Sequence, residues 1–113
     1  MVLTDAQDIR GPVLVLCTHN SVRSPIAESF LSKALGGEVK VVSAGLDPQE
    51  VDPFAAAAMS ECGMDIAGHP PTGSDDESLK AYGAFGLVIA LSRPALERAR
   101  EIGKSCHAPV EYW

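Results

Sequence analysis

The chain alternates between short continuous apolar runs and segments whose apolar residues recur at helical spacing. Continuous runs of Val, Leu and Ile are typical of strands buried on both faces of a parallel sheet, and the helical segments supply the crossovers between them. Alternation of this kind favours a right-handed parallel α/β sheet. The pattern predicts strands at 13–17, 39–45, 85–91 and 110–113 and helices at 25–36, 53–62, 74–82 and 94–102.

Polar residues and glycines mark the expected helix ends. Asp52 and Ser92 are typical N-caps, and a proline follows each of them within two residues. Glycines at 36, 63 and 103 are expected to end three of the helices. Two apolar faces are expected to be buried: Ile26, Ala27, Phe30, Leu31, Ala34 and Leu35 on the first helix, and Phe54, Ala55, Ala58, Met59 and Cys62 on the second.

The composition of the 113 residues, 46% hydrophobic and 21% charged, is that of one globular domain. Residues 1–10 lack an apolar signal core and are expected to be a disordered start to a cytoplasmic protein. Every apolar run is shorter than the ~18 residues of a membrane span, so we expect no membrane association. The formal net charge of -6 argues against general nucleic-acid binding, which needs clustered Lys and Arg.

Cysteines at 17, 62 and 106 and histidines at 19, 69 and 107 are scattered, and the cysteines form no CxxC pair. These spacings predict neither a disulfide framework nor a zinc site. We therefore expect no metal and no cofactor. Cys62 is interpreted as a core residue of the second helix. Asp47 is interpreted as a surface residue close to the edge at which the strands end.

The stretch from Cys17 to Ser24 joins the first strand to the first helix and carries the candidate chemistry. Loop N–H groups and the helix dipole make such a junction an anion site. The dipole and Arg23 both favour a thiolate at Cys17, and the planar guanidinium suits a tetrahedral oxyanion. Ser24 can donate a hydrogen bond to the thiolate. A lone Cys at a strand end is ordinarily a buried core thiol, whereas this combination of residues favours a nucleophile.

The segment VLCTHNSVRSPIAESF at 15–30 resembles the phosphate-binding loop and first helix of the low-molecular-weight protein tyrosine phosphatases and of the arsenate reductases of the same fold. The resemblance extends through SAG at 43–45, DPFA at 52–55, GMDIAGH at 63–69 and LVIALS at 87–92. It implies a single domain over residues 1–113, a three-layer α/β sandwich whose four-stranded parallel sheet has the order 2-1-3-4. It also implies a C-terminally truncated member, without the family's last helix and the Asp-containing loop that supplies the general acid.

The resemblance implies site residues position by position. Cys17, Arg23 and Ser24 are the implied catalytic residues, as nucleophile, oxyanion clamp and hydrogen-bond donor to the sulfur. His19 stands where many relatives carry Gly, so its side chain is expected at the mouth of the loop, where it could alter substrate fit. The implied substrate-binding loop is Thr18, His19, Asn20, Ser21, Val22 and Arg23, and the implied hydrogen-bonded brace around it is Asn20, Ser43 and His69.

Three functional classes fit these residues. The first is a hydrolase of phosphotyrosine-like phosphomonoesters that works through a cysteinyl-phosphate, favoured by RSPIAE at 23–28. The second is an arsenate reductase, favoured by the ending VEYW; it would need an external thiol, because the region after the third strand carries Ser92 and only Cys106. The third is a non-catalytic oxyanion-binding module.

The expected ligand in all three classes is a phosphate, sulfate or arsenate-type oxyanion in the loop. The expected protein partner is a second copy of the chain. Because the family's last helix is expected to be missing, we expect one face of the sheet to be uncovered and to form a homodimer interface.

Overall fold

The structure is a computed structural model that describes residues 11–19, 23–36, 39–47, 49, 51–63, 72–74 and 77–113, without the side chains of 23, 77 and 78. The expectation of a disordered start at 1–10 lies outside these residues. The elements in chain order are β1 (Val13–Cys17), α1 (Arg23–Ala34), β2 (Val41–Gly45), α2 (Pro53–Glu61), the 3-10 helix η2 (Glu77–Tyr82), β3 (Leu87–Ala90), α3 (Arg93–Cys106) and β4 (Val110–Tyr112).

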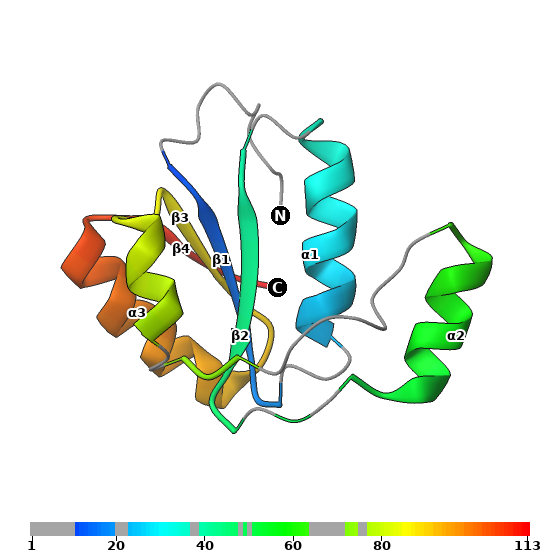
Figure 1. Ribbon diagram of the computed structural model, residues 1–113. Helices are drawn as coiled ribbons and strands as arrows, with labels where there is room; N and C mark the ends of the chain where they lie inside the picture. The colour runs from blue at the N-terminus through cyan, green and yellow to red at the C-terminus, as the bar shows by residue number, and fades with distance from the viewer. Residues whose placement is uncertain are drawn as a thin grey trace.

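The four strands form one parallel sheet in the order β2-β1-β3-β4 (Figure 1), which confirms the predicted fold class and strand order. Val13 of β1 is in register with Val41 on one side and with Leu87 on the other. β1 is therefore a central strand with neighbours on both sides. Because the strands are parallel, their carboxyl ends meet at one edge of the sheet, and Cys17 is the last residue of β1 at that edge.

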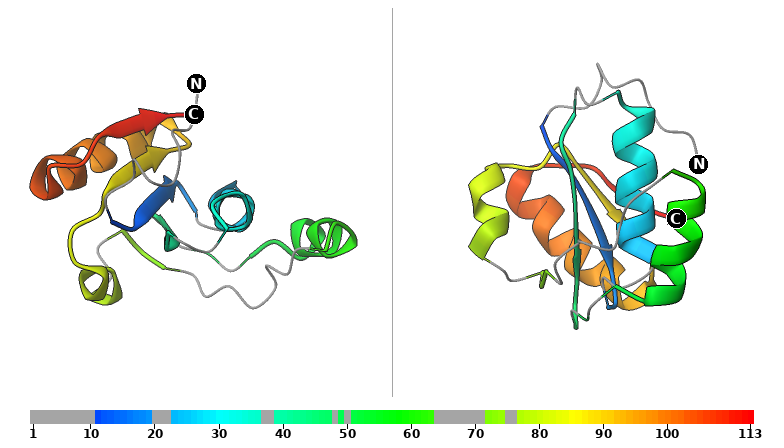
Figure 2. Two further views of the ribbon diagram at one scale, coloured as in Figure 1. Left: turned by 90° about the horizontal axis from the view of Figure 1, so that it is seen from above. Right: turned by 45° about the vertical axis from the view of Figure 1, so that its right-hand side comes forward.

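Alternate residues of β1 point into two separate cores, one on each face of the sheet. Leu14 and Leu16 belong to the core under η2 and α3, whereas Val13 and Val15 belong to the core under α1. The view from above shows the sheet between α1 on one side and α3 on the other (Figure 2). All five residues of β1 are buried, which explains why its sequence is a continuous apolar run rather than an alternating one.

Helix α2 begins as predicted, but its expected buried face is wrong. The Asp52 carboxylate accepts a hydrogen bond from the Phe54 N–H at 3.2 Å, as an N-cap does. Only Met59 of this helix is buried, while Phe54 is 86% exposed and Cys62 is exposed. Helix α1 lies between α2 and the sheet (Figure 1), so α2 has no direct access to the core under the sheet.

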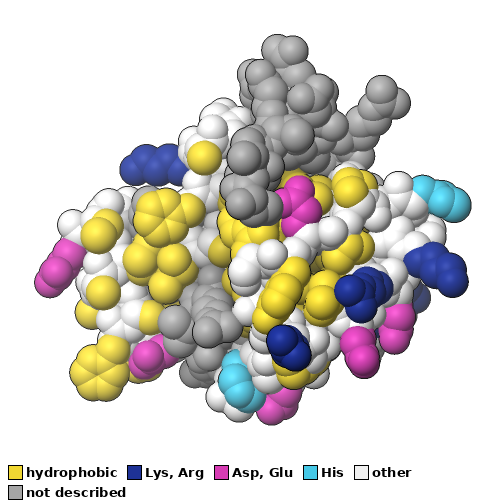
Figure 3. Space-filling model, turned by 180° about the vertical axis from the view of Figure 1, so that it is seen from behind, with side chains coloured by type: hydrophobic (Ala, Val, Ile, Leu, Met, Phe, Trp, Pro, Cys, Tyr) yellow, Lys and Arg dark blue, Asp and Glu magenta, His cyan; other side chains and the backbone are white. Residues whose placement is uncertain are grey.

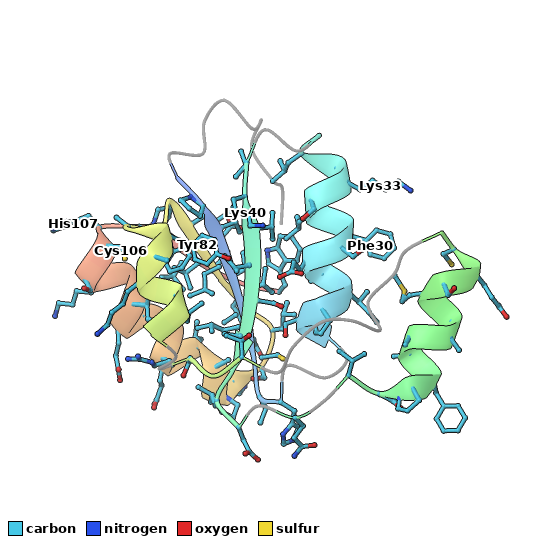
Figure 4. The ribbon with its side chains drawn as sticks, viewed as in Figure 1. Phe30, Lys33, Lys40, Tyr82, Cys106 and His107 are labelled. Atoms are coloured by element: carbon cyan, nitrogen blue, oxygen red, sulfur yellow. The ribbon has the colours of Figure 1, made fainter. Side chains whose placement is uncertain are left out.

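Helix α1 also departs from its predicted face. Leu31 and Leu35 are buried against the sheet, whereas Phe30 is 52% exposed and Ala34 is exposed. Figure 4 shows Phe30 pointing from α1 away from the sheet and toward the side on which α2 lies. From behind, hydrophobic side chains gather on the part of the surface that carries α1 and α2, and charged side chains gather over α3 (Figure 3).

Helix α3 begins at its predicted N-cap and continues past its predicted end. Gly103 was expected to end the helix but lies inside it, and the helix runs to Cys106. A Cβ on Gly103 would lie 2.5 Å from Cγ2 of Val110 and 3.0 Å from the carbonyl oxygen of Ala108. Gly103 therefore provides the space in which the chain folds back into β4. His107 ends the helix in the left-handed conformation, at φ 56°.

Three smaller differences concern element bounds and type. β2 begins at Val41 rather than at residue 39, because its partner β1 begins at Val13. β3 starts at Leu87 rather than at residue 85, and Phe85 is buried beside Tyr82 instead of pairing in the sheet. The helix expected at 74–82 is a 3-10 helix from Glu77. Among the helices of the described residues, none is both long and apolar enough to cross a membrane.

Candidate functional site

The thiol of Cys17 meets the hydroxyl of Ser24 at the junction of β1 and α1. Their Sγ and Oγ atoms lie 2.9 Å apart, although the two residues are seven positions apart in the chain. Cys17 is 4% exposed and Ser24 is 0% exposed. Both are fixed by regular structure, since Cys17 ends β1 and Ser24 is the second residue of α1. A hydroxyl in this position can donate a hydrogen bond to a thiolate.

The remaining predicted loop residues are only partly described. Arg23 is the first residue of α1, so its backbone lies at the amino end of the helix that carries Ser24. Its side chain, together with Asn20, Ser21, Val22 and His69, lies outside the described residues. Their predicted roles stay predictions.

Ser43 of the predicted brace is buried in β2, beside the central strand. It is 2% exposed, and its Cα is in register with that of Val15. Two residues further on, Gly45 forms two backbone hydrogen bonds: its N–H donates to Thr72 at 2.8 Å, and its carbonyl accepts from Ser74 at 2.9 Å. Residues 72–74 therefore lie against the end of β2. The brace itself stays a prediction, because its other two members lie in the undescribed segments.

Thr18 connects the loop to helix α3. Its Oγ1 lies 3.1 Å from Oγ of Ser92, 74 residues later in the chain. The same Ser92 oxygen accepts a hydrogen bond from the Ala95 N–H at 3.3 Å, which confirms its predicted role as N-cap. The sequence identified Ser92 only as a cap. Its position directly after β3 was the available signal, because the ends of neighbouring parallel strands share one edge.

The segment after β2 runs alongside the start of the loop. The N–H groups of Leu46, Asp47 and Gln49 donate to the carbonyl oxygens of Cys17, Thr18 and His19 at 3.1, 2.7 and 2.7 Å. We call residues 46, 47 and 49 the strap. Three backbone hydrogen bonds fix the path of the loop where it leaves β1, independently of side-chain identity.

The imidazole of His19 contacts the strap as well. Its Nδ1 lies 3.3 Å from the Asp47 carbonyl oxygen and 3.7 Å from Oδ2 of the same residue. The side chains are 49% and 73% exposed. The sequence had indicated that Asp47 lies near this edge and had interpreted it as a surface residue. It is exposed as expected, but its contact with His19 was not anticipated.

The other two cysteines lie away from Cys17. Cys62 follows α2 and is exposed, and Cys106 is the last residue of α3. Ser92 at the start of α3 adjoins Thr18, and the 14 residues of the helix at about 1.5 Å each put Cys106 about 21 Å further along. Figure 4 shows Cys106 and His107 at that far end. Across the described part of the chain, no three His, Cys, Asp or Glu residues converge as metal ligands would.

The fold and this geometry define an α/β protein with a buried thiol where the central strand passes into a helix. Residues 12–112 match the family model of the low molecular weight phosphotyrosine protein phosphatases. The chain belongs to this family. The match confirms the resemblance inferred from the loop and covers nearly the whole chain.

Named relatives and solved structures include both activities found among such proteins. An arsenate reductase of Bacillus subtilis is 40% identical over 101 residues, which are 89% of this chain and 69% of that protein. A solved arsenate reductase in the phosphate binding state is 29% identical with a TM-score of 0.63, covering 92% of this chain and 76% of that one. The tyrosine phosphatase Wzb from Escherichia coli K30 in complex with sulphate is 26% identical with a TM-score of 0.67, covering 88% and 69%.

The chain is shorter than the relatives that it matches. The matched region is 69% of the Bacillus subtilis protein, 55% of an arsenate reductase of Halalkalibacterium halodurans and 44% of one of Staphylococcus haemolyticus. The matched regions thus cover between 44% and 69% of the length of these three relatives.

Proposed function

We propose that the chain is a phosphomonoester hydrolase in which Cys17 is the nucleophile. The observation that carries this proposal is the 2.9 Å contact between Sγ of Cys17 and Oγ of Ser24 at the amino end of α1. A hydroxyl at this distance can donate a hydrogen bond to the sulfur, and a thiolate is a much better acceptor than a neutral thiol. The helix dipole at the same position adds partial positive charge. The pairing therefore supports a thiolate rather than an inert core cysteine.

The proposed reaction has two displacements. In the first, the Cys17 thiolate attacks phosphorus, the S–P bond forms, and the ester P–O bond breaks as the leaving oxygen takes up a proton. In the second, water attacks the cysteinyl-phosphate, which releases inorganic phosphate and returns the sulfur as a thiolate. Ser24 stabilises the negative sulfur at the start and at the end. Arg23 and the loop N–H groups are proposed to hold the equatorial oxygens, with Asn20, Ser43 and His69 supporting the loop.

Arsenate reduction is a second candidate, favoured by the 40% identity to a protein named arsenate reductase. Here the Cys17 thiolate attacks As(V) and displaces water, which gives a cysteinyl-arsenate. An attacking thiol then forms a mixed disulfide with Cys17 as the S–As bond breaks and As(III) leaves as arsenite, and a second thiol restores Cys17 by disulfide exchange. Cys106 lies at the far end of α3 from the loop edge (Figure 4), so it is badly placed to attack that adduct. An external thiol is the proposed reductant.

One comparison of rates separates the candidates. The full chain is assayed for hydrolysis of 4-nitrophenyl phosphate and for thiol-dependent consumption of arsenate, each beside Cys17→Ser. Hydrolysis that disappears in Cys17→Ser supports the hydrolase, and arsenate consumption that disappears in it supports the reductase. Phosphate binding without either reaction would reduce the proposal to an oxyanion-binding module. A cytoplasmic location and a homodimer are proposed on the sequence alone, and sedimentation velocity tests the second.

A further inference from the structure

His19 is held at the rim of the loop by contacts that fix both its backbone and its ring. Its carbonyl oxygen accepts from the Gln49 N–H at 2.7 Å, and its Nδ1 lies 3.3 Å from the Asp47 carbonyl oxygen. The first contact fixes the backbone whatever the side chain, and the second places the imidazole against the strap. The side chain nevertheless keeps 49% of its surface exposed, two residues after Cys17.

The contact with Asp47 determines which ring nitrogen carries the proton. A carbonyl oxygen can only accept, and so can the exposed Asp47 carboxylate, whose Oδ2 lies 3.7 Å from Nδ1. Nδ1 is therefore assigned as the donor. In the neutral imidazole, Nε2 on the other side of the ring then has a lone pair and acts as an acceptor.

We propose that His19 is a specificity-determining residue of the loop, whose Nε2 accepts a hydrogen bond from the leaving group of the substrate. This inference rests on the proposed function of Cys17. The substrate class it selects is an oxyanion ester whose leaving group bears an O–H or N–H donor close to the ester oxygen. His19 would thereby discriminate between esters by their leaving groups.

The experiment measures binding rather than turnover. Dissociation constants are determined for inorganic phosphate, phenyl phosphate and the three hydroxyphenyl phosphates in a Cys17→Ser background, in which no covalent adduct forms. His19→Ala, His19→Asn and His19→Gln are compared in that background. The Asn nitrogen can occupy the position of Nδ1 but not that of Nε2, and the Gln amide reaches the position of Nε2.

We expect at least one hydroxyphenyl isomer to bind about three- to tenfold more tightly than phenyl phosphate, the effect of one half-exposed hydrogen bond. That advantage over phenyl phosphate should disappear in the Ala and Asn variants and persist in part in the Gln variant. His107→Asn is the matched control, because His107 is an exposed histidine at the far end of α3 and Asn tolerates its left-handed backbone.

Three results would overturn the inference. If no isomer is favoured, or if His19→Ala keeps the preference, the rim does not select the leaving group. If His19→Asn keeps it, His19 acts only through its tie to Asp47. If neither phosphate nor any ester binds, the proposed function of the loop fails and the inference falls with it, a result distinct from equal binding of all the esters.

Discussion

At the scale of single residues, Cys17 and Ser24 have to be understood together. Burial of Cys17 at 4% exposure is what a structural core cysteine would also show. Ser24 makes the difference, because it is 0% exposed and its hydroxyl contacts the sulfur. A hydroxyl at this distance can donate to a thiolate, which is the state of the sulfur that the proposed nucleophile needs.

Ser24→Ala should lower kcat far more than it weakens phosphate binding. A hydrogen bond to a charged group contributes about 1.5–3 kcal/mol, so kcat should fall by about 10- to 100-fold. The measurement is hydrolysis of 4-nitrophenyl phosphate together with the rate of alkylation of Cys17 by iodoacetamide, which should also fall. Ser105→Ala, at an exposed serine of α3, is the control. Unchanged kcat and alkylation in Ser24→Ala would mean that Ser24 does not stabilise the thiolate.

The sequence identified the nucleophile but not the contacts that surround it. Cys17 and Ser24 are joined by local spacing, a strand end followed by a helix start, so the motif alone predicts their proximity. The contact of Thr18 with Ser92 and that of His19 with Asp47 join residues 74 and 28 positions apart. Such contacts depend on strand order and register, which no local pattern contains. The strap was missed for the same reason, since backbone hydrogen bonds leave no signature in side-chain identity.

At the scale of elements, α3 contacts the loop at one end and the last strand at the other. Its N-cap Ser92 adjoins Thr18, and Gly103 lies against Val110 of β4. The helix thus links the start of the loop to the edge of the sheet through two small residues, Ser92 and Gly103. Helix α2 also has a side-chain N-cap, Asp52, whose carboxylate accepts a hydrogen bond from the Phe54 N–H of its own helix.

Comparison of the two N-caps separates helix stability from loop position. Ser92→Ala and Asp52→Ala should each cost about 1 kcal/mol of unfolding free energy, because each removes one capping hydrogen bond. Only Ser92→Ala should also lower kcat, by a few-fold, since it frees Thr18 from α3. Urea unfolding and steady-state kinetics check the two effects, and Thr18→Val should reproduce the kinetic effect without the loss of the cap. Equal kinetics in both alanine variants would contradict the coupling.

Gly103→Ala should destabilise the protein, although alanine is the better helix former by about 1 kcal/mol. The added Cβ would lie 2.5 Å from Cγ2 of Val110, so β4 or the end of α3 has to shift, at about 1–3 kcal/mol. The measurement is the midpoint of urea unfolding. Val110→Ala in the same chain should recover part of the loss by removing the clashing methyl group. A midpoint that rises in Gly103→Ala would mean that helix propensity outweighs the clash.

Element type and order could be predicted, whereas the buried face of an outer helix could not. Strand runs such as 13–17 are apolar because both faces of the sheet are covered, so their assignment needs no further information. Phe30 and Phe54 lie on helical stripes, yet they are 52% and 86% exposed. A periodic stripe identifies which residues share a face of the helix, but not what lies opposite that face. Gly103 is a related case. A glycine that is needed for close packing inside a helix cannot be told from a glycine that ends a helix by sequence alone.

At the scale of the whole molecule, the proposed anion site is a local feature of an acidic chain. Fifteen Asp and Glu against nine Lys and Arg give the net charge of -6, so the molecule as a whole repels oxyanions. The groups proposed to bind the anion are therefore short-range ones at the end of β1: the loop N–H groups, the amino end of α1 and Arg23. Because added salt screens the long-range repulsion more than the short-range contacts, phosphate affinity should hold or rise slightly as ionic strength increases.

Oxyanion binding at this site should stabilise the entire fold, because the site connects β1, α1, the strap and α3. A ligand at 100 times its Kd adds about 2.7 kcal/mol to the unfolding free energy, which corresponds to roughly 10 °C in Tm for a chain of this size. Thermal unfolding in phosphate, against chloride at equal ionic strength, measures the effect. Cys17→Ser should keep the rise in Tm, because non-covalent binding needs no sulfur, whereas Arg23→Ala should abolish it. A rise that survives in Arg23→Ala would remove Arg23 from the anion site and leave the loop N–H groups and the helix dipole as the groups that hold the ligand.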